Sequence, residues 1–259
     1  MSDADAPAQQ MMSAVVADDV PAVEALVRDE PDLVRLQGDL DKSFLHWAAE
    51  LDSPGVARIL VEAGSDLQAT TQFGMTAFQW AAAVGSRRTA DVLLAAGAEF
   101  DLWTAAGLGE LGYVGSCFDA EGTWLRAPSL VLCGEKNGEC AVSTERGHVV
   151  DAALHVACRN GHAAVARLLQ RCGADPDALG YFRASALHWS ALRGFLECLG
   201  ALIEAGAQLE VRDTEFDATP LGWALRGGHA PVARALFNAG AGATHSQLTR
   251  LQELESAPA

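Results

Sequence analysis

The sequence predicts an all-α solenoid built from about seven helix-turn-helix units. Similar segments recur along the chain, as in "SFLHWAAELDSPGVARILVEAGS" and "SALHWSALRGFLECLGALIEAGA". Each copy holds two short segments of helical apolar periodicity, separated by glycine or a polar break. Helix start and stop signals stand at the same place in each copy. Because neither helix of a pair can bury its apolar face alone, the pairs must stack on one another and share a continuous core.

The period is measured from one aligned position, called here the His slot. The slot is filled by His46, Gln79, His155, His188 and Gly222. The steps from 46 to 79 and from 155 to 188 are 33 residues, and the step from 188 to 222 is 34. A weaker copy places Ser13 another 33 residues before His46. A fixed period of this size is the signature of a stacked repeat array.

Capping residues stand at repeating positions on both sides of the helix pairs. Ser43, Ser185 and Thr219 precede a first helix and can cap it, and Pro220 then occupies the first turn, where its missing N–H costs nothing. A glycine able to adopt a left-handed conformation ends the second helix in most units. These glycines are Gly64, Gly97, Gly173, Gly206 and Gly240.

With its period of 33 and its T-P-L-H-x-A core, the chain resembles the ankyrin-repeat family, and in particular bacterial members that carry "LHWA". The resemblance covers about residues 11–242. It implies L-shaped repeats in which the turn before each first helix, called here the finger, forms a concave partner-binding face together with the first helices. It also implies that the slot histidine ties adjacent turns together, and it implies no cofactor. We therefore expect a protein interaction or scaffolding module.

The sequence divides into three parts. Residues 1–10 are polar or small and predict a disordered tail, and residues 11–242 form the repeat domain with an insert at about 122–150. Residues 243–259 predict a capping helix and a tail, because Leu248, Leu251 and Leu254 follow a helical spacing.

Net charge limits the classes of partner. Lys and Arg number 18 against 34 Asp and Glu, a formal charge of −16, so we expect no binding to nucleic acid or to an anionic membrane surface. A protein partner should be neutral or basic. The acidic N-terminus and the lack of a long apolar run predict a cytoplasmic location.

The period breaks at two places. Matching Ala105 with Ala81 puts Trp103 in the His slot only 24 residues after Gln79, which indicates a shortened finger. The next step, from Trp103 to His155, is 52 residues, and the extra residues contain two β-prone runs around "GEKNG" that predict a hairpin. The insert can wall off the concave groove and form a pocket, or it can be a surface decoration; both alternatives stay open.

The cysteines and histidines do not form a recognisable catalytic or metal motif. Cys117, Cys133, Cys140 and His148 lie near the insert, but their spacing contains no C-x2-C knuckle, so no metal is predicted. Cys133 and Cys140 bracket the hairpin tip and can face each other across it.

Finger aromatics are the candidates for partner contact. Phe73, Phe182 and Phe216 each precede a slot-adjacent Trp by seven residues and stand in protruding fingers. The predicted partner-binding residues are Phe73, Tyr181, Phe182, Arg183, Glu215, Phe216 and Asp217, with a second set of Trp124, Arg126, Glu135 and Lys136 in the insert. Alternatively, each finger Phe folds over its neighbouring Trp and only closes the core.

An alternative function is a small-molecule-binding protein, or a cofactor-independent isomerase or cyclase, with its ligand in a pocket between the insert and the concave face. That pocket would be lined by Trp103, Tyr113, Cys117, Trp124 and His148.

Overall fold

The computed structural model describes residues 5–125, 131–136, 139–143 and 145–256. Within these ranges, the description does not include the side chains of Asp5, residues 131–143, Arg146 and Tyr181. The chain separates into two compact units, Met1–Phe100 and Asp101–Ala259, and each is described by itself. None of the described helices combines the length and the apolar character needed to cross a bilayer.

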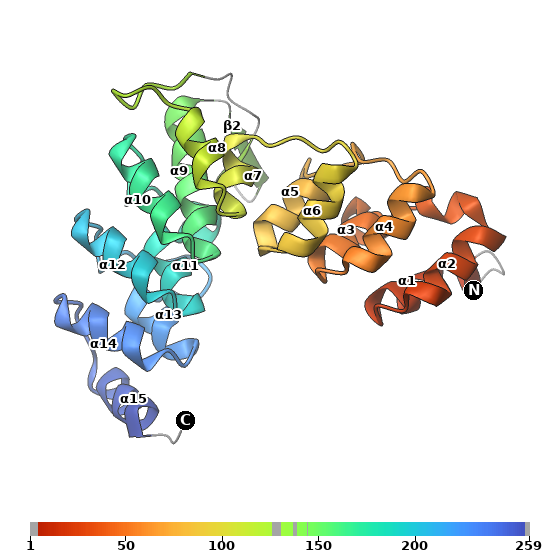
Figure 1. Ribbon diagram of the computed structural model, residues 1–259. Coiled ribbons are helices and arrows are strands. Elements are labelled where there is room, and N and C mark those ends of the chain that lie inside the picture. The colour runs from red at the N-terminus through yellow and green to blue at the C-terminus, as the bar shows by residue number, and fades with distance from the viewer. Residues whose placement is uncertain (1–4, 126–130, 137–138, 144, 257–259) are drawn as a thin grey trace. The chain divides into compact units, whose positions relative to one another are not determined.

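The first unit contains three stacked helix pairs (Figure 1). Its helices are α1 (Asp5–Val16), α2 (Val20–Asp29), α3 (Phe44–Glu50), α4 (Pro54–Glu62), α5 (Ala77–Val84) and α6 (Arg87–Ala95), with the 3-10 turns η1 (Pro31–Arg35) and η2 (Asp39–Asp41). The first helices α1, α3 and α5 contact one another in sequence, and the second helices α2, α4 and α6 do the same.

The second unit contains four further pairs and a terminal helix. Its elements are α7 (Leu102–Gly107), α8 (Leu111–Ser116), β1 (Val131–Lys136), β2 (Glu139–Ser143), α9 (Arg146–Arg159), α10 (Ala163–Arg171), η3 (Tyr181–Arg183), α11 (Ala186–Arg193), α12 (Leu196–Glu204), α13 (Pro220–Arg226), α14 (Ala230–Asn238) and α15 (His245–Ser256). In Figure 1, α9, α11 and α13 lie side by side and α10, α12 and α14 form a second layer. The predicted helical-repeat solenoid is confirmed.

Helix α1 begins earlier than expected. Residues 5–10 were expected to belong to a disordered tail, but they form the first turns of α1. Pro7 lies in the first turn, where a missing N–H is tolerated. Met11 and Val15 are fully buried on the same helix, so packing of its apolar face stabilises turns that are polar by composition.

The core repeats with the period of the sequence. One fully buried leucine from the second helix recurs in five units, at Leu60, Leu93, Leu169, Leu202 and Leu236. Burial of such a side chain contributes about 2–3 kcal/mol. Alanine pairs such as Ala48 and Ala49, and Ala81 and Ala82, are fully buried in the first helices, which lets neighbouring pairs approach closely.

Each regular finger is a tight turn closed by one main-chain hydrogen bond. The N–H groups of Gly38, Thr71 and Gly180 donate to the carbonyl four residues ahead, at 2.9–3.0 Å. In the last finger the N–H of Asp213 instead donates to the carbonyl of Ala218, five residues ahead, at 3.1 Å. This extra finger residue accounts for the single 34-residue step.

A left-handed residue recurs three positions before the start of each first helix that follows a regular finger. The position is filled by Asp41 (φ 56°), Gly74 (φ 73°), Arg183 (φ 53°) and Asp217 (φ 47°). Only one of the four is glycine, although left-handed backbone costs other residues about 1–2 kcal/mol. Three fingers therefore carry backbone strain at their tips.

The slot histidines link each finger to the next, as the family resemblance implies. The Nδ1 of His46 accepts the N–H of Ser43 at 3.2 Å, which leaves Nε2 to donate to the carbonyl of Met75 at 2.9 Å. His188 repeats this arrangement with the N–H of Ser185 at 3.1 Å and the carbonyl of Ala218 at 3.2 Å. One buried imidazole thus joins the start of its own helix to the following finger.

The structure corrects the assignment of Trp103 to the His slot. Asp101 caps α7 by accepting the N–H of Thr104 at 2.7 Å, so Thr104 stands three residues after the cap, as His46 does after Ser43. Trp103 lies one position earlier. The cap was not evident from the sequence, because Asp101 replaces the Ser or Thr that stands at the start of α3, α5, α11 and α13.

The finger before α7 is absent. Only residues 96–101 connect α6 to α7, whereas residues 63–76 connect α4 to α5. Neighbouring fingers elsewhere are hydrogen-bonded, since Gln72 N–H donates to the Leu40 carbonyl and Thr214 N–H to the Phe182 carbonyl. The chain divides into its two units at the one connection between helix pairs, among the described residues, that is too short for such a finger.

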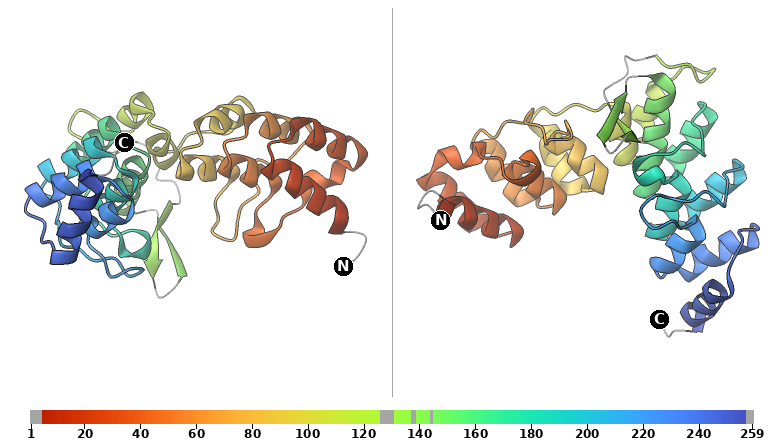
Figure 2. Two further views of the ribbon diagram at one scale, coloured as in Figure 1. Left: turned by 90° about the horizontal axis from the view of Figure 1, so that it is seen from below. Right: turned by 180° about the vertical axis from the view of Figure 1, so that it is seen from behind.

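The insert forms an enlarged finger. The predicted hairpin is present as β1 and β2, and β1 packs beside α9 and η3 (Figure 2). Cys140 is registered opposite Glu135, and Cys133 lies at a register shift, so the expected cross-strand placement of the two cysteines is wrong. Helix α9 already begins at Arg146, so residues 146–150 belong to the helix rather than the insert. In α3, α5, α11 and α13 a Ser or Thr three residues before the His slot marks the start of the helix. The sequence at the same place before His155 has no such cap and no proline, so α9 continues further toward the N-terminus.

Substitutions at the left-handed finger position should change stability in opposite directions. Gly74→Ala should lower the free energy of unfolding by about 1 kcal/mol, because a Cβ there meets open space and only the backbone is strained. Asp41→Gly should be neutral or stabilising for the same reason. Urea unfolding measures both, and a stabilising Gly74→Ala would contradict the explanation.

Stability should fall on acidification because slot histidines are buried in the neutral form. Burial lowers the pKa of His155 to about 4, against the opposing hydrogen bond to the Ala178 carbonyl. Since the unfolded side chain titrates near 6.5, the unfolded state binds more protons between about pH 6.5 and 4, and stability is lost as pH falls through that window. The urea midpoint of His155→Gln should therefore decrease less between these pH values than that of the wild type; an equal decrease would contradict the assignment.

Candidate functional site

The second unit carries a continuous row of aromatic rings between its first helices and its last finger. The centroids of Trp189 and Trp223 lie 5.2 Å apart at 89°, and those of Phe216 and Trp223 lie 5.9 Å apart at 67°. Trp189 and Trp223 stand one residue after the His slot on α11 and α13, and Phe216 is at the finger tip. We call these three side chains the aromatic row.

Arginines stand at both ends of the aromatic row. The guanidinium carbon of Arg159 lies 4.8 Å from the Trp189 centroid, and that of Arg226 lies 4.0 Å from the Phe216 centroid. Such stacking of a cation on an aromatic face is attractive. Arg159 and Arg226 occupy the same repeat position, four residues after the His slot, on α9 and α13.

Asp213 fixes the finger against the aromatic row. Its Oδ1 accepts the N–H groups of Glu215 and Phe216, and its Oδ2 accepts the N–H of Ala218 and the indole Nε1–H of Trp223, all at 2.7–3.1 Å. Burial opposes ionisation of this carboxyl, but the four hydrogen bonds outweigh it and hold the pKa of Asp213 below its ordinary value. Both carboxylate oxygens of Asp213 thus face N–H donors of the protein instead of the solvent.

The first unit places a lysine where the second has arginines. Lys42, at the end of the first finger, has 6% of its side chain exposed and contacts Glu50 at 2.5 Å. Its Nζ lies 4.4 Å from the centroid of Trp47 and 4.1 Å from that of Trp80. This cation is neutralised and enclosed, so we regard the cluster as a structural link between finger and helices.

The slot-adjacent tryptophans differ in burial. Trp223 is only 2% exposed and belongs to the core. Trp47, Trp80 and Trp189 stay half-buried and contact a cation. Their side chains therefore contribute to the surface as well as to the core.

The structure describes most of the predicted finger residues. Phe216 has 43% of its side chain exposed while it packs on Trp223, so it serves both in packing and as surface. Phe182 is half-buried with a left-handed backbone, and its carbonyl accepts from the N–H and hydroxyl of Thr214 at 2.8 and 3.0 Å. Arg183 beside it is exposed.

The remaining predicted contact residues are dispersed. Glu215 and Asp217 are exposed, and Asp217 pairs with Arg212 at 3.4 Å. Phe73 is half-buried in a finger of the first unit. Arg126 lies outside the described residues, as do the side chains of Tyr181, Glu135 and Lys136.

Two of the five predicted pocket side chains, Trp124 and Cys117, make local contacts within their own repeat. Trp124 packs on Phe118 with centroids 5.5 Å apart, and the Cys117 thiol is buried and donates to the Tyr113 carbonyl at 3.3 Å. His148 is exposed near the start of α9, with Nδ1 3.7 Å from Glu145, and Trp103 is half-buried on α7. Among the described residues, no group of three or more His, Cys, Asp or Glu could hold a metal ion.

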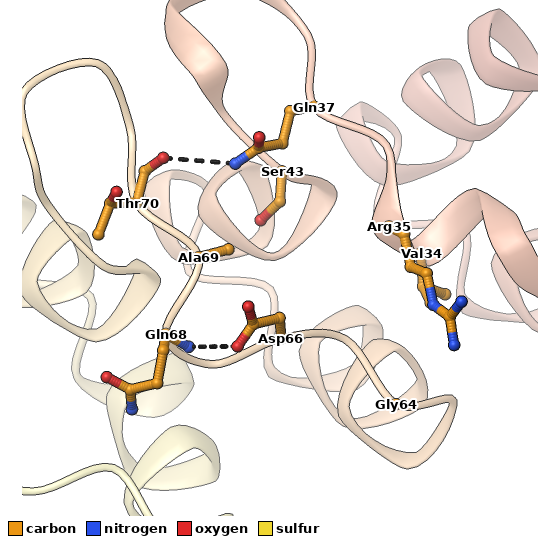
Figure 3. A pocket seen from close by; sticks show the side chains of 9 residues that line it. All are labelled: Val34, Arg35, Gln37, Ser43, Gly64, Asp66, Gln68, Ala69 and Thr70. Atoms are coloured by element: carbon orange, nitrogen blue, oxygen red, sulfur yellow. Dashed lines mark hydrogen bonds between the residues drawn. The ribbon is translucent and has the colours of Figure 1, made fainter.

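A hollow of about 610 Å³ lies in the first unit, between η1 and the loop that follows α4 (Figure 3). It is lined by Val34, Arg35, Gln37, Ser43, Gly64, Asp66, Gln68, Ala69 and Thr70. Most of these residues are exposed, and Gln37 already donates to the Thr70 carbonyl at 3.3 Å. A buried ligand normally requires an apolar, concave lining, so this open polar hollow is a poor candidate.

Sequence analysis missed the cations that flank the tryptophans. Arg159, Arg226 and Lys42 were not among the predicted site residues, nor was Asp213. For two of them a positional signal exists: four residues after the His slot stand Arg159 and Arg226, whereas the other copies have Glu50, Ala83 and Leu192 there. No such offset marks Lys42 or Asp213.

Removing the Asp213 carboxylate should destabilise the second unit. Asp213→Asn replaces one acceptor oxygen by an amide donor and leaves two N–H groups without partners, at a cost of about 2 kcal/mol or more. Trp223→Phe removes only one of the four hydrogen bonds and part of a ring, so a smaller cost is expected. Thermal unfolding of both variants tests this order, and a fully stable Asp213→Asn would contradict it.

Relatives of known name match parts of the chain. Human cyclin-dependent kinase inhibitor 2A is 38% identical over 96 residues, which are 37% of this chain and 61% of the relative. The palmitoyltransferase AKR1 of Kluyveromyces lactis is 32% identical over 90 residues, 34% of this chain and 12% of the relative. The putative E3 ubiquitin-protein ligase XBAT31 of Arabidopsis thaliana is 33% identical over 86 residues, 33% and 19% of the two chains. The matches therefore cover less than two thirds of each relative's length.

A solved structure and a family model match larger parts of the chain. The crystal structure of the human ASB11 ankyrin repeat domain covers 90% of this chain and 98% of its own, with 21% identity and a TM-score of 0.43. The family model for ankyrin repeats (3 copies) matches residues 11–102 and 154–247, and so leaves out the irregular repeat and the insert. This chain belongs to the ankyrin-repeat family, whose repeats indicate a protein–protein interaction module.

Proposed function

We propose that the protein binds a protein partner on the finger-facing surface of its second unit. The observation that carries this proposal is the exposed Phe216, held on Trp223 and Arg226 instead of being withdrawn into the core. Aromatic residues and arginine, fixed in place before binding, are the side chains that dominate protein interfaces. The surface comprises Trp189 and Phe216, with Trp223 buried beneath them, together with Phe182, Arg183 and the flanking arginines.

Rigidity of the fingers supports this proposal. Asp213 holds the main chain of the last finger with three hydrogen bonds, and Thr214 joins that finger to Phe182 of the previous one. A preorganised surface loses little conformational entropy when a partner docks. The strained left-handed backbone at Phe182, Arg183 and Asp217 fits the same role, since such strain concentrates at functional sites.

The partner-binding role of the insert and of Phe73 stays a secondary proposal. The hairpin packs beside η3 and therefore stands next to the finger that carries Phe182 and Arg183. A partner docked on these fingers would meet the hairpin as its neighbour. No contact among the described residues favours the alternative small-molecule or enzymatic role over this one.

A reducing compartment such as the cytoplasm is also proposed. Cys158 and Cys198 are thiols, hydrogen-bonded to each other in the core. Paired thiols of this kind persist where glutathione keeps them reduced.

Finger-surface substitutions should abolish partner capture while a matched substitution elsewhere does not. We expect Phe182→Ser and Phe216→Ser, combined, to reduce the proteins retained from a lysate of the source cells by tagged protein. The control is Phe237→Ser on α14, a phenylalanine with 37% exposure that also contacts an arginine, Arg234, at 5.8 Å.

The readout is quantitative mass spectrometry of the captured proteins, with circular dichroism to confirm folding of each variant. A captured set that is unchanged in the finger variant would contradict the proposed surface. A set that is lost in Phe237→Ser alone would place the interface on the second helices instead.

A further inference from the structure

Arginines at the ends of three successive first helices form a row in the second unit. Arg159 ends α9, Arg193 ends α11 and Arg226 ends α13, which gives one arginine for each successive repeat. Within the described part of the chain, no carboxylate forms an ion pair with any of the three. This is unusual in a chain with formal charge −16, where acidic residues outnumber basic ones.

Arg159 is the most constrained member of the row. Its Nε is buried, and no described atom accepts its hydrogen. Burial, together with the positive charge of Arg193, lowers the pKa of Arg159. A buried donor without an acceptor and two like charges in proximity both disfavour the isolated protein. An anion placed between the two guanidinium groups would relieve the repulsion between them.

Carboxylates of the neighbouring finger do not provide this anion. The oxygens of Asp213 are turned inward to four N–H donors, and Asp217 pairs with Arg212. The repeat position of Arg159 and Arg226 is filled in the first unit by Glu50, which pairs with Lys42, and by Ala83. Arg193 stands one residue further along its own repeat, at the end of α11. The row of arginines is therefore specific to the second unit and does not follow from the repeat itself.

We propose that the partner segment bound by the second unit is an acidic linear peptide, whose carboxylates contact Arg159, Arg193 and Arg226 and whose apolar side chains rest on Trp189 and Phe216 of the aromatic row. This inference rests on the proposed function and specifies the chemistry of the partner. This proposal differs from the neutral or basic partner expected from net charge alone, because it is based on the local charge of this surface.

A peptide suits the row better than a nucleic acid does. Arginine binds carboxylates through paired N–H groups, and residues on successive first helices can be contacted by an extended chain that crosses them. A nucleic acid also carries anions, but its long charged backbone would be repelled by the acidic remainder of this protein.

The test begins with selection of random linear peptides on the full-length protein, followed by affinity measurement for the strongest binders. We expect enrichment of Asp and Glu among the selected peptides and weaker binding at higher salt. Arg193→Gln and Arg226→Gln should each lower affinity about tenfold, as expected for loss of a hydrogen bond to a charged group. Both side chains are exposed, so the fold should persist.

The matched control is Arg171→Gln, which removes the same charge from an exposed arginine at the end of α10. It should leave affinity unchanged; an equal loss would show a general effect of net charge and overturn the proposal. Arg159→Lys keeps the charge but removes the Nε–H, and it should weaken binding more than Arg171→Gln does.

Three outcomes separate failure of this inference from failure of the proposed function. Peptides that require Phe216 but show no acidic enrichment would overturn the inference and leave the proposed surface intact. Peptides that bind equally well to Phe216→Ser would contradict the surface itself. A single-stranded oligonucleotide that binds as tightly, with the same dependence on Arg193 and Arg226, would replace the peptide by a nucleic acid and overturn the inference.

Discussion

The hydrogen bond from a slot histidine to the following finger is the interaction on which the repeat architecture depends. His46 and His188 accept the N–H of the residue that starts their helix and donate to a carbonyl one finger ahead. Each imidazole thereby fixes the distance and the phase between consecutive repeats. Because Nδ1 is occupied as an acceptor, the proton must stay on Nε2, and the neutral form is required for the link.

Fingers positioned in this way determine which side chains reach the surface. The last finger is one residue longer than the other regular fingers, and Asp213 stabilises it from within by accepting three main-chain N–H groups and the Trp223 indole. Phe216 is consequently held above Trp223 and beside Arg226. The carboxylate that closes this turn therefore also fixes the positions of Phe216 and Trp223. The proposed binding surface thus depends on the hydrogen bonds within one turn.

The two irregular connections have different consequences. Loss of the finger before α7 removes the main-chain link that joins successive fingers elsewhere, and the chain divides into two units at this connection. The enlarged finger before α9 places a β-hairpin beside η3, next to the proposed binding surface. The shortened connection thus separates the two units, whereas the enlarged finger adds an element beside the proposed binding surface.

The sequence by itself determined the repeat period, the helix pairs, the caps and the hairpin, because these depend on local residue patterns such as Ser43 before His46 or a terminal Gly64. It also indicated the finger aromatics, of which Phe216 proved exposed. It did not reveal that Thr104 and not Trp103 occupies the slot, that α1 begins at Asp5, or that Cys133 and Cys140 are out of register. Only the tertiary structure decided that Arg159, Arg193 and Arg226 form one row that no described carboxylate neutralises, because residues one repeat apart become neighbours only when the repeats stack.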